Sequence, residues 1–153
     1  MEIETTTADN SRDTVLNAAK PAEGKGEEFR VLVIDDNIDG ADTMALLLET
    51  MGYEARALYD GAMVVETVRS WRPHAVLMDL ALPDTDGYTL ARALRAELLE
   101  VQPVLIALTG WSRPQDSVAT RAAGFSAHLV KPIELDVIES LLERVKAGVT
   151  PAL

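Results

Sequence analysis

The sequence predicts an α/β fold in which a five-stranded parallel sheet is covered by helices on both faces. Two features predict it. Short apolar runs such as 31–34 and 75–78 contain no polar residue, which is typical of strands buried on both faces. Segments with helical periodicity separate these runs, and parallel strands require a right-handed helical crossover between them. The 153 residues are enough for one domain with a substantial core.

The first half of the chain is expected to contain two strands and two helices. Strand 31–34 leads into a helix that ends at Gly52. Strand 53–58 is less apolar, so we expect it near a sheet edge. Asp60 is expected to cap the second helix, which ends before Pro73. The predicted apolar faces are Ala41, Met44, Leu47, Leu48 and Met51 in the first helix, and Met63, Val64, Thr67, Val68 and Trp71 in the second.

The second half is expected to contain three strands and three helices. The strands are 75–78, 103–108 and 127–130. Ser112 and Gln115, three positions apart, resemble a capping box at the start of the fourth helix, which Gly124 ends. The predicted apolar faces are Tyr88, Leu90, Ala91, Leu94 and Leu98 in the third helix, and Leu135, Ile138, Leu141, Leu142 and Val145 in the fifth.

Composition and charge limit the classes of protein to which the chain can belong. The net charge is -11, and nucleic-acid binding draws most of its affinity from basic side chains, so we expect no nucleic-acid partner. The absence of cysteine excludes disulfides and thiolate metal sites. No apolar run approaches the roughly 20 residues that cross a bilayer. The acidic amino end is also unlike a secretory signal, so we expect a cytoplasmic protein without membrane insertion.

Both ends of the chain are expected to lie outside the folded domain. Residues 1–28 are rich in Thr, Asp, Glu, Lys and Gly, which predicts a flexible polar tail. The apolar pattern then runs from 29 to 147. Gly148 and Pro151 release the chain from the last helix, so 148–153 should form a short second tail.

Four of the predicted strands end in residues that can do chemistry. Asp35 and Asp36 follow the first strand, Asp79 the third, Thr109 the fourth and Lys131 the fifth. Ligands of parallel sheets bind beyond the carboxyl ends of the strands, at the point where strand order reverses. We therefore expect these side chains to converge at one edge of the sheet.

A group of this composition is suited to phosphoryl chemistry. Converging carboxylates repel one another unless a positive charge intervenes, and oxygen ligands without His or Cys suit a hard ion such as Mg²⁺. The Lys131 ammonium and the Thr109 hydroxyl can donate to phosphoryl oxygens. Phosphoryl transfer asks mainly for positioning and charge neutralisation. Asp79 is the best placed nucleophile, because its strand is central and carboxylates form acyl phosphates.

Other motifs in the sequence fail as functional signatures. The segment 35–40 resembles the start of a calcium-binding EF-hand loop, but Leu46 stands where that loop requires a bidentate Glu. The first strand ends in acid rather than in a phosphate loop, which argues against a flavin carrier. The sequence has no G-x-x-x-x-G-K motif and no Ser-His-Asp or Cys-His grouping, so a P-loop protein or a nucleophilic hydrolase has little support.

Residues 29–147 resemble a response-regulator receiver domain, the phosphoacceptor half of two-component signalling. The motifs that carry the resemblance are Asp35-Asp36, Asp79 with Leu82-Pro83 and Asp86-Gly87, Thr109-Gly110, and Lys131-Pro132. The resemblance implies a flavodoxin-like (βα)5 doubly wound sheet with strand order 2-1-3-4-5. It also implies that Asp79 takes a phosphoryl group from a sensor histidine kinase or a histidine phosphotransfer protein, and that a downstream protein target responds.

The resemblance also assigns roles to single residues. Asp36 and Asp79 would bind Mg²⁺ directly with the backbone carbonyl of Ala81, and Asp35 would help through water. Lys131-Pro132 resembles the cis peptide of the family, which would aim the ammonium into the site.

Switching in the family couples a hydroxyl, here Thr109, to an aromatic ring three residues before the Lys, where this chain has His128. An imidazole at that position can change its charge near neutral pH. The alternative is an ordinary strand-end histidine with a satisfied hydrogen bond. Ala81 and Trp111 are apolar where the family's water route passes, so we expect a long-lived phosphoryl group, although Trp111 could instead pack against a helix or a partner.

The expected function is that of a single-domain response regulator. Such a protein is a signalling phosphoacceptor rather than an enzyme, and catalyses only its own phosphorylation and slow autodephosphorylation. The alternative is a receiver fold that acts through a surface without being phosphorylated. The presence of the whole acceptor set favours the first.

Overall fold

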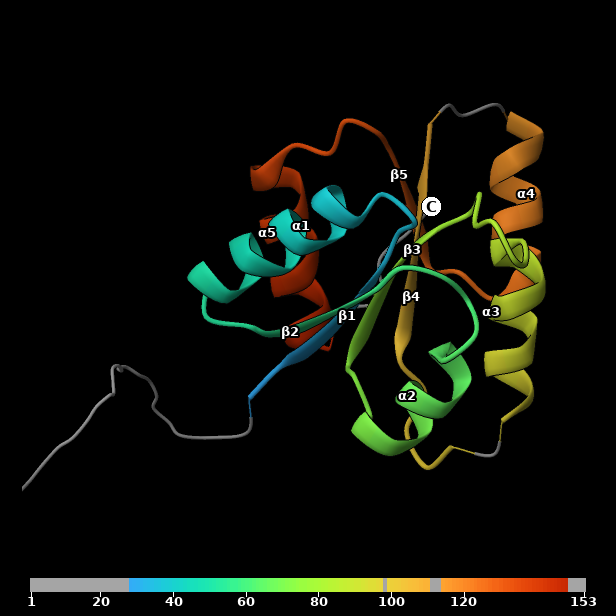
Figure 1. Cartoon of the computed structure of the whole chain (residues 1–153), viewed down its shortest axis with the longest axis horizontal. Helices are drawn as coiled ribbons and strands as arrows, with labels where there is room; N and C mark the ends of the chain where they lie inside the picture. Colours follow the sequence, from blue (N-terminus) through green and yellow to red (C-terminus); the bar gives the residue numbers. More distant parts are fainter. Residues whose placement is uncertain (1–27, 98, 111–113, 149–153) are drawn as a thin grey trace, which may run out of the picture.

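The computed structural model describes residues 28–97, 99–110 and 114–148. Strands and helices alternate along the chain, as predicted (Figure 1). The strands are β1 (Arg30–Ile34), β2 (Glu54–Leu58), β3 (Ala75–Asp79), β4 (Val104–Thr109) and β5 (Ala127–Val130). The helices are α1 (Ile38–Thr50), α2 (Val64–Trp71), α3 (Gly87–Ala96), α4 (Pro114–Ala123) and α5 (Leu135–Lys146). Within these ranges no helix has the length and apolar character that a membrane span requires.

Some predictions concern residues outside this description. The two predicted tails lie outside it except for Glu28 and Gly148. Ser112 of the predicted capping box and Leu98 of the third helix also lie outside the described residues.

The strands form one parallel sheet in the order β2-β1-β3-β4-β5, which confirms the predicted topology. β1 lies between β2 and β3, and its Ile34 is in register with Leu58 on one side and Met78 on the other. β2 is an edge strand, as its weaker apolar pattern predicted. The chain runs outward from β1 to β2 and then returns to β3, so the strand order reverses between β1 and β3.

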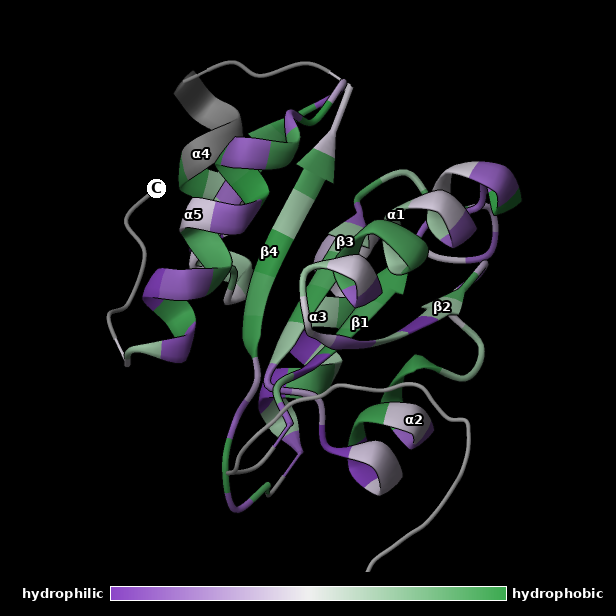
Figure 2. Ribbon diagram, turned by 90° about the vertical axis from the view of Figure 1, so that its left-hand side faces the viewer, coloured by the Kyte–Doolittle hydropathy of each residue, from purple (hydrophilic) through white to green (hydrophobic). Residues whose placement is uncertain are grey.

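Two helical layers enclose the sheet and explain why the central strands lack polar residues. On one face Val31 and Val33 of β1 pack in a core cluster with residues of α1 and α5. On the other face Leu32 and Ile34 pack with residues of α2, α3 and α4. Figure 1 shows these two helical groups on opposite sides of the strands. Figure 2 shows hydrophobic residues along β1, β3 and β4, with hydrophilic and hydrophobic residues alternating around the helices.

Three details of the helix predictions are wrong. Asp60 does not cap α2, because its Oδ1 accepts a hydrogen bond from the Ala62 amide at 3.0 Å and so closes a turn before the helix begins. Met63 precedes the first helical turn and the residue is 48% exposed. Leu135 stands at the first position of α5, before the helix reaches the sheet, and is 41% exposed. The predicted stops at Gly52 and Gly124 are present, with left-handed φ angles of 95° and 110°.

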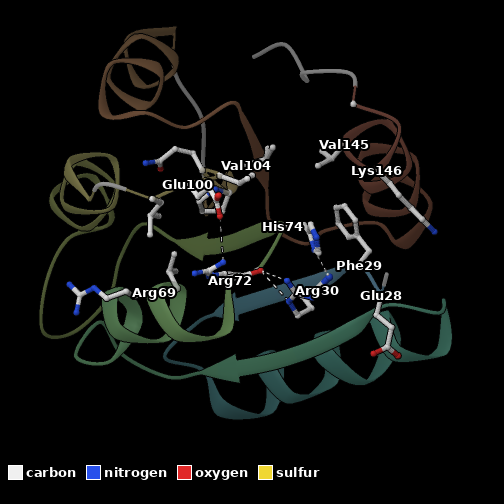
Figure 3. Close-up of a pocket in the computed structure, with 17 residues that line it drawn as sticks. Glu28, Phe29, Arg30, Arg69, Arg72, His74, Glu100, Val104, Val145 and Lys146 are labelled. Carbon is white, nitrogen blue, oxygen red and sulfur yellow. Dashed lines mark hydrogen bonds and ion pairs between the residues drawn. The ribbon is translucent and has the colours of Figure 1, made fainter. Parts of the chain in front are cut away.

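The amino-terminal edge of the sheet is closed by polar contacts between neighbouring segments. The Arg30 amide donates to Nδ1 of His74 at 2.9 Å, and the Phe29 ring stacks on His74 with ring centroids 4.7 Å apart. The Arg30 guanidinium donates to the carbonyls of Trp71 and Arg72 at the end of α2. Phe29, Arg30, Arg72 and His74 line a cavity of about 700 Å³ (Figure 3).

Candidate functional site

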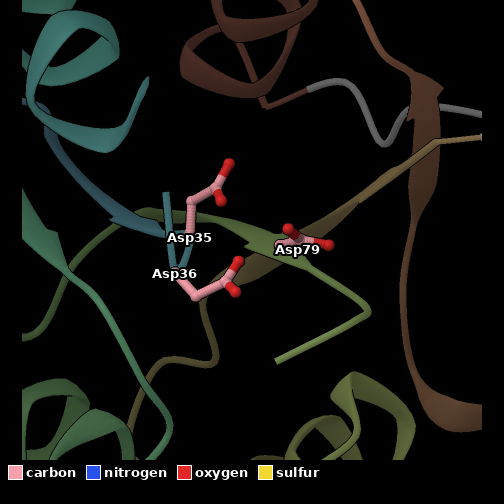
Figure 4. A group of neighbouring side chains, drawn as sticks. All are labelled: Asp35, Asp36 and Asp79. Atoms are coloured by element: carbon pink, nitrogen blue, oxygen red, sulfur yellow. The ribbon is translucent and has the colours of Figure 1, made fainter. Parts of the chain in front are cut away.

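Three carboxylates meet at the carboxyl edge of the sheet, beside the point where the strand order reverses. Asp35 and Asp36 follow β1, and Asp79 is the last residue of β3. One oxygen of each lies within 4.8 Å of the others, and Figure 4 shows the three side chains gathered at the strand ends. Asp35 and Asp79 are each only 7% exposed, whereas Asp36 is exposed. The cluster therefore has a buried floor and an open side.

Local turns fix the two buried carboxylates. Oδ1 of Asp35 accepts a hydrogen bond from the Asn37 amide at 3.0 Å, and Oδ1 of Asp79 accepts one from the Ala81 amide at 3.0 Å. In each case the side chain bonds two residues ahead and bends the backbone out of the strand. One oxygen of each carboxylate is thus occupied by its own loop, and the other is available to different partners.

Lys131 provides the positive charge of the site. Its amide donates to the Thr109 carbonyl at 2.7 Å, which continues the β4–β5 ladder, and the Lys131-Pro132 peptide is cis. Its Nζ donates to Oδ2 of Asp35 at 2.8 Å and to Oδ2 of Asp79 at 3.0 Å. The ammonium therefore bridges the two carboxylates that the sheet buries.

These contacts move the pKa values of Asp35 and Lys131. Burial opposes ionisation of Asp35, but the Lys131 ammonium and the Asn37 amide together outweigh burial and lower its pKa. Burial likewise opposes the charge of Lys131, and the hydrogen bonds to Asp35 and Asp79 raise its pKa in spite of that. The ion pair is therefore fully charged at neutral pH.

The other predicted site residues lie at or near the same edge. β4 ends at Thr109, which is bonded to Lys131 through the backbone. His128 is partly buried in β5 opposite Ala107, so its role as the switch partner of Thr109 stays a prediction. Ala81 is exposed and its amide donates to Asp79, and its role as a carbonyl ligand also stays a prediction. Trp111 lies outside the described residues.

Sequence reasoning overlooked two residues that shape this edge. Asn37 caps α1 by accepting from the Gly40 amide at 3.0 Å, and an Asn directly before a helical pattern could have revealed that role. Asp84 accepts from the Gly61 amide at 2.9 Å, across 23 residues of sequence. No local pattern predicts such a contact between two loops.

Comparison with known families decides what kind of site this is. The family model of the response regulator receiver domain matches residues 31–143. The chain belongs to this family. Receiver domains are signalling phosphoacceptors of two-component systems rather than true enzymes, and the resemblance noted in the sequence is confirmed.

Individual relatives agree with the family assignment. The chain is 33% identical over 130 residues to the CAI-1 autoinducer sensor kinase/phosphatase CqsS of Vibrio cholerae, covering 84% of this chain and 18% of the relative. It is 37% identical over 118 residues to the transcriptional regulatory protein PrrA of Mycobacterium tuberculosis, covering 77% of this chain and 48% of the relative. The chain thus spans less than half the length of these two relatives.

A solved structure shows the same fold. The CheY-like response regulator receiver domain from Methylobacillus flagellatus is 27% identical and superposes with a TM-score of 0.69. The match covers 78% of this chain and 99% of that one.

Proposed function

We propose that Asp79 accepts a phosphoryl group in a Mg²⁺-dependent reaction, and that the phosphorylated domain changes its interaction with a downstream protein. The observation that carries the proposal is the meeting of Asp35, Asp36 and Asp79 with the Lys131 ammonium at one sheet edge. Phosphoryl transfer to a carboxylate requires positioning and charge neutralisation, and this arrangement is suited to both.

The donor set fits a hard divalent cation. Within the part of the chain that the structure describes, the cluster joins three carboxylates to one ammonium, so net negative charge remains. All its candidate ligands are oxygens, which suits Mg²⁺. Asp36, Asp79 and the Ala81 carbonyl would hold the ion, with Asp35 acting through water. Bound Mg²⁺ would neutralise the carboxylates and the incoming phosphoryl oxygens.

The residues of the chain then perform separate tasks in the transfer. A carboxylate oxygen of Asp79 forms the new bond to phosphorus as the bond from phosphorus to the donor imidazole breaks. Lys131, already within hydrogen-bond distance of Asp79, would donate to a phosphoryl oxygen, and the Thr109 hydroxyl would donate to another. The burial of Asp79 limits the access of water to the resulting acyl phosphate.

The proposed donor is a sensor histidine kinase or a histidine phosphotransfer protein. The relatives support a place in two-component signalling, since one is described as a sensor kinase/phosphatase and another as a transcriptional regulatory protein. The single-domain character, the cytoplasmic location and the absence of a nucleic-acid partner stay predictions.

Incubation with acetyl phosphate and Mg²⁺, followed by intact-mass measurement, tests the acceptor role. We expect the mass of one phosphoryl group to be added, and we expect Asp79→Asn or removal of Mg²⁺ with EDTA to prevent it. Asp60→Asn is the matched control, because Asp60 bonds only within its own turn among the contacts found for it. A wild-type protein that gains no mass would favour the alternative, an interaction module that works without phosphorylation.

A second test addresses switching. We propose that Thr109 moves toward the bound phosphoryl group when the domain is phosphorylated, and that the His128 ring moves into the space that Thr109 leaves. His128→Ala should then be phosphorylated normally but should lose the change in partner binding. Partner binding that still responds to phosphorylation would remove His128 from the mechanism.

A further inference from the structure

The loop from Leu80 to Asp86, between β3 and α3, carries Ala81 beside Asp79 and is held firmly at its base. The Leu80 amide donates to the Leu108 carbonyl at 3.0 Å, and the Gly87 amide donates to the Leu80 carbonyl at 2.9 Å. Ala81 and Asp86 form an antiparallel bridge across the loop. Hydrogen bonds therefore join the two ends of the loop to each other, close to the end of β3.

The tip of the loop has a separate attachment, to a different part of the molecule. Both carboxylate oxygens of Asp84 accept from the Gly61 amide, at 2.9 and 3.1 Å. Gly61 lies in the turn between β2 and α2, and it is buried. A Cβ at this glycine would stand 2.6 Å from Cγ2 of Thr85, so the loop tip rests directly on the turn.

We propose that Asp84 is a positioning residue for the cation site. By fastening the loop tip to the β2–α2 turn, it fixes the direction of the Ala81 carbonyl relative to the carboxylates of Asp36 and Asp79. The proposal rests on the function proposed above, in which this carbonyl is a ligand. Without the attachment, only the base of the loop and Leu82 would hold it in place, so cation binding would have to fix the direction of the Ala81 carbonyl, and that ordering lowers the affinity.

The contact pattern favours this role over a simple contribution to the core. Asp84 is exposed and lies outside both core clusters, so its side chain adds no apolar packing. Its hydrogen bonds join the loops that follow β2 and β3, and β1 separates these two strands in the sheet. The loop that Asp84 attaches to the β2–α2 turn also contains Ala81, whose amide donates to Asp79 at 3.0 Å.

Titration of the whole chain with Mg²⁺ alone, by isothermal calorimetry, tests the proposal. We expect Asp84→Ala to raise the Kd for Mg²⁺ about tenfold, at the low end of what loss of an outer-shell partner costs. Asp84→Asn keeps one acceptor oxygen and should bind almost as wild type does, although it has lost the same charge. Asp60→Ala, which removes a neighbouring carboxylate bonded only to Ala62 among the contacts found for it, should also bind as wild type.

Substitutions at Gly61 and Thr85 test the contact between the loop tip and the β2–α2 turn by steric means. Gly61→Ala should weaken Mg²⁺ binding, because its new methyl group displaces Thr85. Thr85→Ser removes the obstructing Cγ2, so the double variant should recover affinity that Gly61→Ala lost. Thermal unfolding in EDTA confirms that each variant is folded at the titration temperature.

The outcomes separate the two proposals. If wild type binds Mg²⁺ and Asp84→Ala binds it equally well, Asp84 has no positioning role and the acceptor proposal is unaffected. Lowered thermal stability of Asp84→Ala with an unchanged Kd leads to the same conclusion. If wild type binds no Mg²⁺, the acceptor proposal fails and the role of Asp84 fails with it.

Discussion

The amino and carboxyl edges of the sheet differ in how their charged side chains are arranged. At the amino edge two ion pairs join separate partners, with Arg69 bonded to Glu97 at 2.9 Å and Arg72 near Glu100 at 3.8 Å. At the carboxyl edge Lys131 is shared between Asp35 and Asp79, and Asp36 adds a third carboxylate. Each of these two pairs at the amino edge joins one acid to one base, whereas the cluster at the carboxyl edge has three carboxylates for one ammonium and retains negative charge.

This difference shows how a parallel sheet separates structure from function. At the amino edge Arg30 and His74 use their polar atoms to satisfy backbone groups of neighbouring elements. Substitutions there should alter stability and leave cation binding alone. At the carboxyl edge the three carboxylates repel one another, and the cation that we propose would relieve that repulsion. Substitutions that change the charge of this cluster should therefore alter stability and cation binding in opposite directions.

The largest expected effect follows from removing the shared ammonium. Lys131→Met leaves two buried carboxylates without their cation, and in EDTA we expect the free energy of unfolding to fall by about 2 kcal/mol. Added Mg²⁺ should reduce the difference from wild type, because it supplies the missing positive charge. Chemical denaturation with and without Mg²⁺ measures both values. Lys146→Met is the control, since among the described residues the contact found for the Lys146 ammonium is with the Tyr53 ring, 5.6 Å from its centroid.

The same ion pair sets a pH dependence. Because the pKa of Asp35 lies below its ordinary value of 3.8, its pairing with Lys131 stabilises the fold above that pH and is lost as the pH falls through the lowered value. The raised pKa of Lys131 keeps the pair intact on the alkaline side beyond 10.5. Denaturation series in EDTA should therefore show the advantage of wild type over Lys131→Met shrinking in acid. An advantage that persists at the lowest pH would contradict the assignment.

Arg30→Met tests the amino edge of the sheet. It removes the donors to the last carbonyls of α2, and we expect a loss of about 1 to 2 kcal/mol in stability. The Kd for Mg²⁺ should not change. Arg69→Met provides the control, because its ion pair is largely exposed and should contribute only about 0.5 kcal/mol. A changed Kd in Arg30→Met would mean that the two edges are coupled.

Asp36→Asn should raise stability, whereas Lys131→Met and Arg30→Met should lower it. Relief of repulsion from Asp35 and Asp79 should raise the free energy of unfolding in EDTA by about 1 kcal/mol, while affinity for Mg²⁺ falls. Glu97→Gln, the corresponding loss of an acid at the amino edge, should instead lower stability slightly. Equal signs for the two substitutions would refute the contrast between the edges.

The smallest expected effect concerns the backbone at the amino edge. Arg72 ends α2 with a left-handed φ of 55°, a conformation that a glycine adopts at lower cost. Arg72→Gly should therefore raise the melting temperature slightly, by an amount corresponding to about 0.5 kcal/mol. Arg72→Ala loses the same side-chain charge but keeps Cβ, so it should give no such gain.

Helix boundaries show where sequence reasoning was reliable and where it was not. Gly52 and Gly124 were identified correctly as helix stops because a left-handed terminus favours glycine whatever surrounds it. Asp60 was misassigned because a carboxylate that can cap a helix can equally close a turn. The choice between them depends on where the helix begins, which packing of Val64 and Val68 against the sheet decides.

The candidate site divides in the same manner. Asp35, Asp36, Asp79, Thr109 and Lys131 could be named from sequence, because each follows an apolar run and parallel strands carry such residues to one edge. The contribution of Asp84 could not, since its partner Gly61 belongs to another loop.

The sequence by itself determined the alternation of strands and helices and the edge at which the reactive groups gather, since both depend on local apolar patterns and on the rules of parallel sheets. Only the tertiary structure decided how those groups pair. Lys131 bonds to Asp35 across 96 residues and to Asp79 across 52, and the folded chain alone fixes those distances. Pairing of this kind depends on the relative placement of whole elements, which no local stretch of sequence contains.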